Sequence, residues 1–143
     1  MLGGDRSGWR GYVSSRTING NVVPQRVQNL VLRDYARRHK LLYLLSATEY
    51  GMPGCFMILQ SVLQNLNGLA GLIFYSPHQL PADDKDRDAL LSRILEAGCG
   101  IHFALENLAV TTQEDVALLR DIAMVRNLAR SGSDDMPFMA SLP

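Results

Sequence analysis

The feature that most constrains the fold of this chain is a regular alternation of short apolar runs with longer helix-like segments. Four apolar runs have the length of a β-strand and lie at residues 9–15, 41–47, 69–76 and 100–106. This order is typical of βαβ units, in which each crossover helix returns the chain to the same end of the sheet. We therefore expect a three-layer α/β domain with a four-stranded, mainly parallel sheet and helices on both faces.

The first predicted helix begins near Pro24, because the fixed φ of proline suits the first helical turn. The spacing of its apolar side chains predicts an inner face formed by Val27, Leu30 and Val31, with Tyr35 behind them. Its last turn is rich in cations, which complement the helix dipole.

Turn and capping residues mark the other three predicted helices. One starts at residues 53–55 and stops at Asn67, where an Asn-Gly pair breaks the pattern. The next covers residues 83–98, and the last is capped by Thr111 or Thr112.

One domain is expected at residues 9–130, with flexible segments at residues 1–8 and 131–143. Lys plus Arg and Asp plus Glu are 14 each, so the basic excess typical of nucleic-acid-binding proteins is missing and no nucleic-acid partner is expected. No apolar run has the length of a membrane span, and the N-terminus lacks the layout of a signal peptide. We expect a cytoplasmic protein without a membrane partner.

Polar residues follow each predicted strand. Because parallel strands all end at one edge of the sheet, where open α/β sheets bind ligands, these residues are expected to form the rim of one cleft for an anionic small molecule. They are Ser14, Ser15 and Arg16 after the first run, Ser46, Glu49 and Tyr50 after the second, Ser76 and His78 after the third, and Glu106 after the fourth.

Each charged candidate has a functional and a structural interpretation. The planar fork of Arg16 suits a phosphate or carboxylate, but Arg16 could equally pair with Glu49 or Asp34. Glu49 is a candidate general base or a cap for the following helix. His78 suits acid/base chemistry because imidazole titrates near neutrality, or it is an exposed loop histidine without a role.

Cysteine and histidine spacing gives no sign of a metal site. Cys55 is a candidate nucleophile, because a helix start lowers a thiol pKa, or else a small buried residue. Cys99 is far from Cys55 in the sequence, and no ligand spacing connects them, so two free thiols are expected. His102 alternates with apolar neighbours and is interpreted as a hydrogen-bonded core histidine. No common nucleotide, hydrolase or metal motif is present, and no cofactor is expected.

The first run, "RGYVSSR", and the helix after it resemble the catalytic domain of the serine recombinases, the resolvases and invertases. In that family the first strand ends in Tyr-x-Arg-Val-Ser, whose serine attacks DNA. Tyr12 matches this motif, but Ser14 stands in place of the arginine and Arg16 in place of the serine. The family's Asp-Arg-Leu-x-Arg motif is replaced by residues 76–81. The resemblance implies a resolvase-like fold without the recombinase catalytic residues.

Residues 11–36, 42–63 and 102–106 also resemble a small family called sporadic carbohydrate cluster proteins. This resemblance implies a role in making or modifying an unusual carbohydrate or a related small metabolite, and it transfers no catalytic assignment. It is densest at Tyr12, Ser14, Arg16, Gln25, Asn29, Arg33, Ser46, Glu49 and Tyr50.

The leading hypothesis is a small metabolic enzyme that acts on an anionic sugar. Arg16, with Arg33, binds the anion, and Glu49 and His78 transfer protons. The remaining polar residues orient substrate hydroxyls: Ser14, Ser46 and Gln25. Two alternatives stay open, namely a non-catalytic partner or regulatory subunit and a degenerate recombinase that binds DNA, and self-association into a homo-oligomer is also open.

Overall fold

The computed structural model describes residues 8–50 and 55–121. The predicted flexible segments, residues 1–8 and 131–143, lie outside these ranges except for Gly8. The elements are β1 (Trp9–Ser14), α1 (Gln25–Arg38), β2 (Ala47–Glu49), α2 (Met57–Leu63), β3 (Gly71–Phe74), the short 3₁₀ helix η2 (Pro77–Gln79), α3 (Asp84–Glu96), β4 (Gly100–Phe103) and β5 (Leu108–Val110). Residues 113–121 are also helical, and Thr112 Oγ1 accepts a hydrogen bond from the N–H of Asp115 there, as its predicted capping role requires.

The sheet has the strand order β2-β1-β3-β4-β5. The first four strands pair in parallel, which confirms the prediction of a mainly parallel sheet, whereas β5 runs antiparallel to β4. The predicted count of four strands is wrong, because β5 is only three residues long and forms a hairpin with β4. The hairpin turn includes Asn107, whose φ of 56° is a conformation that asparagine adopts more readily than most residues.

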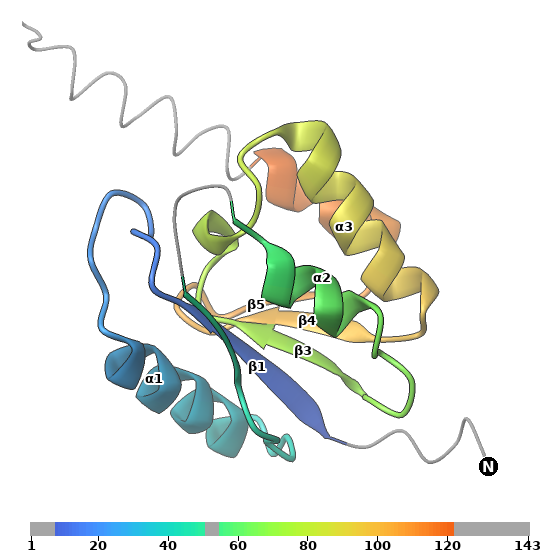
Figure 1. Cartoon of the computed structure of the whole chain (residues 1–143). Helices are drawn as coiled ribbons and strands as arrows, with labels where there is room; N and C mark the ends of the chain where they lie inside the picture. The colour runs from blue at the N-terminus through green and yellow to red at the C-terminus, as the bar shows by residue number, and fades with distance from the viewer. Residues whose placement is uncertain (1–7, 51–54, 122–143) are drawn as a thin grey trace, which may run out of the picture.

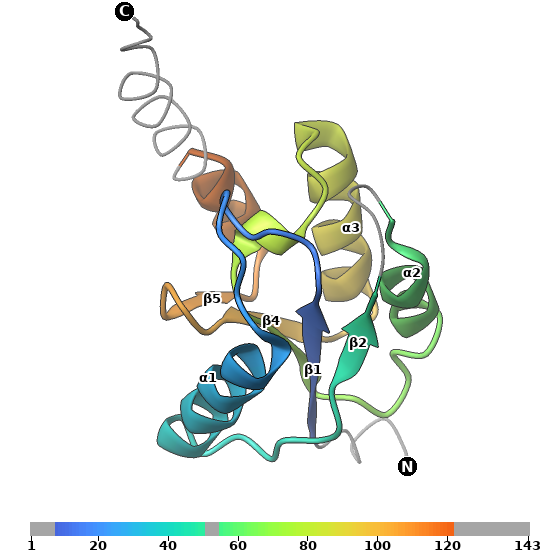
Figure 2. The same cartoon turned by 60° about the vertical axis from the view of Figure 1, so that its left-hand side comes forward.

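Helices cover both faces of the sheet, as Figures 1 and 2 show. On one face α2, α3 and the helix at residues 113–121 enclose the larger apolar cluster, in which Leu59, Leu91 and Val116 pack on Phe74 and Phe103 of the sheet. On the other face α1 encloses a smaller cluster. None of the helices within the described ranges is long and apolar enough to cross a membrane.

The inner face of α1 differs from the prediction. Val27 is 41% exposed and Leu30 is 60% exposed. The face of α1 that packs on the sheet is rotated away from Val27 and Leu30. It includes the polar residue Gln28, which a search for regularly spaced apolar residues does not select. Its buried members are Gln28, Leu32, Tyr35 and Ala36.

The second predicted strand also differs. Residues 41–47 form no continuous strand; Tyr43 makes an isolated bridge with Trp9, and β2 is Ala47–Glu49. Leu45 is 83% exposed, because this segment lies at the edge of the sheet, where apolar side chains are not all covered. The following helix starts at Met57, later than the predicted residues 53–55, of which 53 and 54 lie outside the described ranges.

Two glycines make room for the single tryptophan at the amino ends of the strands. Gly71 of β3 is in register with Gly100 of β4 and with Trp9 of β1. A Cβ atom on Gly71 would overlap the Gly100 carbonyl and the indole ring, and one on Gly100 would lie 2.9 Å from the same ring. The strands therefore pair this closely under the indole only because both positions lack a side chain.

His102 of β4 is hydrogen-bonded, as predicted. The Tyr35 hydroxyl and His102 Nδ1 share a hydrogen bond of 2.5 Å, and the ring of Trp9 meets the imidazole edge-on at 4.7 Å between centroids. Burial, with a smaller contribution from His39, lowers the pKa of His102 below its ordinary value of 6.5.

We predict that the free energy of unfolding decreases as the pH falls below about 6.5. The pKa of His102 is lower in the folded chain than in the unfolded chain, so the unfolded chain binds more protons in this range. Urea unfolding between pH 7.5 and pH 5 measures the effect. His102→Gln should flatten this part of the profile; equal slopes in the wild type and His102→Gln would contradict the prediction.

Candidate functional site

Glu49, the last residue of β2, lies at the centre of the candidate site and is 1% exposed. Its Oε2 accepts a hydrogen bond from the N–H of Ile58 (2.8 Å), and its Oε1 accepts one from the N–H of Leu59 (3.2 Å). These N–H groups belong to the first turn of α2, where they have no partner within the helix. Phe56, at the N-cap position, contributes no side-chain hydrogen bond. Glu49 therefore caps α2 from the neighbouring strand.

Arg16 follows β1 and lies beside Glu49, with 4.0 Å between Nη1 and Oε1. Nη1 donates to the carbonyl of Cys55 (2.7 Å), and Nη2 donates to the carbonyl of Gln79 (2.8 Å). The guanidinium also lies over the Phe56 ring, 4.4 Å from its centroid. Arg16 is only 9% exposed, and its buried guanidinium links the loop after β1 to the segments that contain Cys55 and Gln79.

Tyr12 of β1 bridges the two charged groups. Its hydroxyl donates to Glu49 Oε1 (2.8 Å) and accepts a hydrogen bond from Arg16 Nη2 (3.0 Å). Burial raises the pKa of Tyr12 well above its usual range, and Glu49 acts in the same direction while Arg16 opposes it. The phenol therefore remains protonated at neutral pH and can serve both neighbours at once.

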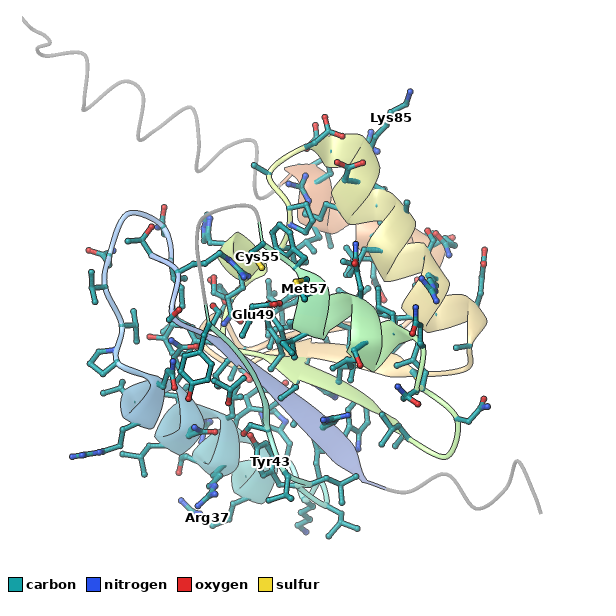
Figure 3. All side chains as sticks on the ribbon, viewed as in Figure 1. Arg37, Tyr43, Glu49, Cys55, Met57 and Lys85 are labelled. Atoms are coloured by element: carbon teal, nitrogen blue, oxygen red, sulfur yellow. The ribbon has the colours of Figure 1, made fainter. Side chains whose placement is uncertain are left out.

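Cys55 is the half-buried member of this group. Its Sγ lies 3.9 Å from Glu49 Oε2 and can donate a weak hydrogen bond to it. Figure 3 shows Glu49 and Cys55 next to each other at the start of α2, close to Met57. Cys55 precedes α2 by two residues and does not lie in its first turn as predicted. Cys55 and Cys99 are both free thiols.

A second polar cluster adjoins the first and contains residues that the sequence analysis did not select. Gln28 of α1 donates to the Ser14 carbonyl (2.7 Å) and accepts from the Ser14 N–H (3.0 Å), so its amide extends the pairing of β1. Gln79 donates to Ser14 Oγ (3.2 Å) and to Gln28 Oε1 (3.1 Å). Since the Gln79 carbonyl also accepts from Arg16, Gln79 connects the two clusters.

The ends of β3 and β4 meet at the same edge. Ser76 is buried, caps η2, and donates through Oγ to Glu106 Oε2 (2.7 Å). The N–H of His78 donates to Ser76 Oγ (3.3 Å). This half-buried histidine directly precedes Gln79 in the chain. Ser76, which follows β3, and Glu106, which follows β4, thus meet at the same edge of the sheet, as expected.

Ser46 and Asn29 form a separate contact. Ser46 Oγ donates to Asn29 Oδ1 and lies 2.6 Å from the Tyr43 hydroxyl. Ser46 precedes β2, so it lies away from the carboxyl edge where it was expected.

Four other candidates are less buried than the residues of these clusters. Gln25 is the half-buried first residue of α1, and Arg33 is exposed on that helix. Tyr50 is 70% exposed, and Ser15 is exposed although its N–H donates to the Glu49 carbonyl (2.9 Å). Gln28, three residues beyond Gln25, is the buried glutamine of this helix and bonds to the Ser14 backbone.

The described residues contain no group of three or more His, Cys, Asp or Glu side chains placed to bind a metal ion. What the arrangement offers chemically is a carboxylate, Glu49, with a cation, a phenol and a thiol beside it. The carboxylate is placed to accept a proton or a hydrogen bond from the phenol and from the thiol.

Two solved structures are similar to this chain over most of its length. The N-terminal catalytic domain of TP901-1 integrase superposes with a TM-score of 0.66 and 14% identity, covering 89% of this chain and 99% of that one. A resolvase family site-specific recombinase from Streptococcus pneumoniae gives a TM-score of 0.63 and 11% identity, covering 87% and 93%. At these identities the likeness concerns the fold, and it confirms the predicted resolvase-like arrangement. No protein-family model matches the sequence, and no curated protein matches it significantly.

We predict that Tyr12→Phe destabilises the fold by about 1–3 kcal/mol, because Glu49 Oε1 loses a buried donor and Arg16 Nη2 loses an acceptor. Urea unfolding measures the change in the free energy of unfolding. Tyr50→Phe is the matched control, since that side chain is largely exposed and its hydroxyl should contribute little. Equal stability of the two variants would show that the Tyr12 bridge is unimportant.

Proposed function

We propose that this protein is a small metabolic enzyme that acts on an anionic sugar or a related small molecule at the carboxyl edge of β1 and β2. The observation that carries the proposal is the contact between Tyr12, Arg16, Glu49 and Cys55. Burying a charged pair is costly, and clusters of buried ionisable groups occur preferentially at functional sites. The resemblance of the sequence to carbohydrate cluster proteins supports the substrate class.

The contacts refine the roles expected from the sequence. The donors of Arg16 are engaged by Tyr12 and by two carbonyl groups, so we assign to Arg16 the positive potential that attracts an anionic substrate, without direct bidentate binding. Glu49 and Cys55 form the proton-transfer pair in this proposal, because the half-buried thiol connects the carboxylate with the rim. His78, on the adjoining loop, is the second acid/base candidate.

The recombinase alternative receives less support from the site. Ser14 is fully buried and its Oγ accepts from Gln79, so this serine is not presented to a DNA backbone. The equal number of acidic and basic residues also gives no excess of positive charge for DNA. A non-catalytic partner is favoured by one observation, the exposed apolar residues of α1 and of the edge segment: Val27, Leu30, Leu42 and Leu45.

A ligand screen tests the substrate class. Phosphorylated sugars and nucleotide sugars are added to the full-length protein, and the melting temperature is measured. We predict that a member of this set raises the melting temperature in a concentration-dependent way, because ligands of the native state stabilise it by mass action. Stabilisation by duplex DNA alone, with a steep loss at higher salt, would instead support the recombinase alternative.

Turnover of a substrate found in this screen tests the role of Glu49. We predict that Glu49→Gln lowers turnover at least about a hundredfold, within the range expected for loss of an acid/base group, while the variant still unfolds cooperatively. Glu96→Gln is the matched control, because Glu96 is exposed at the end of α3. Unchanged turnover in Glu49→Gln would remove Glu49 from the chemistry and leave it only as the cap of α2.

A further inference from the structure

A groove of about 530 Å³ runs between α2 and α3, and Phe56, which lines it, also contacts Arg16 of the candidate site. Figures 1 and 2 show the two helices side by side over the same face of the sheet. Phe56, Leu59 and Leu63 line it from α2 and the residue before it, and Leu90 lines it from α3. Its volume lies within the range of small-molecule sites, which are mostly apolar with a few placed polar groups.

The two charges of the groove lie at opposite ends of its α3 wall. Asp86 and Arg93 both line it and are seven residues apart, which is two helical turns or about 10.5 Å along the axis. Within residues 8–50 and 55–121, neither side chain has an oppositely charged group at ion-pair distance. Leu90 and Ala89 lie between them, so an apolar wall separates a cationic end from an anionic end.

We propose that this groove binds a slender amphipathic molecule with a carboxylate at the Arg93 end. Its apolar chain lies on the partly exposed Phe56 and Leu90, with the buried Leu59 and Leu63 beneath them, and its other end, next to Asp86, is neutral or cationic. Arginine binds carboxylates through two parallel hydrogen bonds, which fixes the direction of the molecule in the groove. Asp86 repels a second anionic group, which gives the site selectivity. This inference does not depend on the proposed enzymatic function.

Three eight-carbon probes test the charge pattern: octanoate, 8-aminooctanoate and octanedioate. Isothermal titration calorimetry with the full-length protein measures their affinities. We expect 8-aminooctanoate to bind most tightly because its ammonium meets Asp86, octanoate to follow, and octanedioate to bind most weakly. Backbone amide NMR should show the largest shift changes at Gln60, Leu63 and Ala89. Equal affinities for 8-aminooctanoate and octanedioate, or shift changes centred elsewhere, would overturn the proposal.

Three variants separate the groove from general effects of charge. Arg93→Gln should weaken octanoate binding about tenfold or more, because a charge-assisted pair is lost. Lys85→Gln is the matched control: Lys85 is an exposed cation of the same helix, and Figure 3 shows it at the helix end, pointing into solvent. Asp86→Asn should remove the preference for 8-aminooctanoate over octanedioate. Equal affinities in Arg93→Gln and Lys85→Gln would refute the site.

Filling the groove gives a test that does not depend on charge. Ala89 is exposed in the middle of the α3 wall, so Ala89→Trp should fold normally and block all three probes. Retained binding in this variant would place the probes outside the groove and overturn the proposal.

Discussion

The capping of α2 by Glu49 is the interaction on which the candidate site depends. A seven-residue helix is too short to be stable alone, and its N-cap residue Phe56 supplies no side-chain acceptor. The acceptor is instead the Glu49 carboxylate of β2, and because this carboxylate is buried, its negative charge needs partners inside the protein. Arg16 and Tyr12 are these partners. The same contacts of Glu49 with Arg16 and Tyr12 therefore fix the position of α2 and compensate the buried charge at the sheet edge.

Much of the architecture was predictable because the underlying signals are local. The alternation of apolar runs with capped helical segments indicated parallel β-strands joined by helices, and the edge where Arg16, Glu49 and Ser76 meet follows from that topology. The hairpin strand β5 was missed because three residues carry no usable periodicity. The face of α1 was misassigned because Gln28 is polar yet buried. Its burial is possible because its amide pairs with the N–H and the carbonyl of Ser14, a contact that the sequence pattern does not reveal.

The meeting of Arg16 and Glu49 at one edge of the sheet was predicted, but the hydrogen bonds that they make there were not. Residue type and position in the chain identified Arg16 and Glu49, and the family resemblances pointed to Tyr12, yet none of these could show that Arg16 would donate to two backbone carbonyls. Gln79 was missed for a similar reason. Its amide joins Ser14 to Gln28 while its carbonyl receives Arg16, and such a junction depends on the packing of segments 65 and 51 residues apart. Long-range polar pairing of this kind leaves no pattern in the sequence.

The arrangement around the single tryptophan has a practical consequence. Trp9 lies over two bare glycines and meets the imidazole of His102, so the indole occupies a niche that exists only while three strands are in register. Its emission is therefore an intrinsic optical probe of sheet assembly at the end remote from Glu49. A loss of order confined to the Glu49 edge would leave that signal unchanged, whereas dissolution of the whole sheet would alter it. The chain thus carries a natural means of distinguishing local from global unfolding.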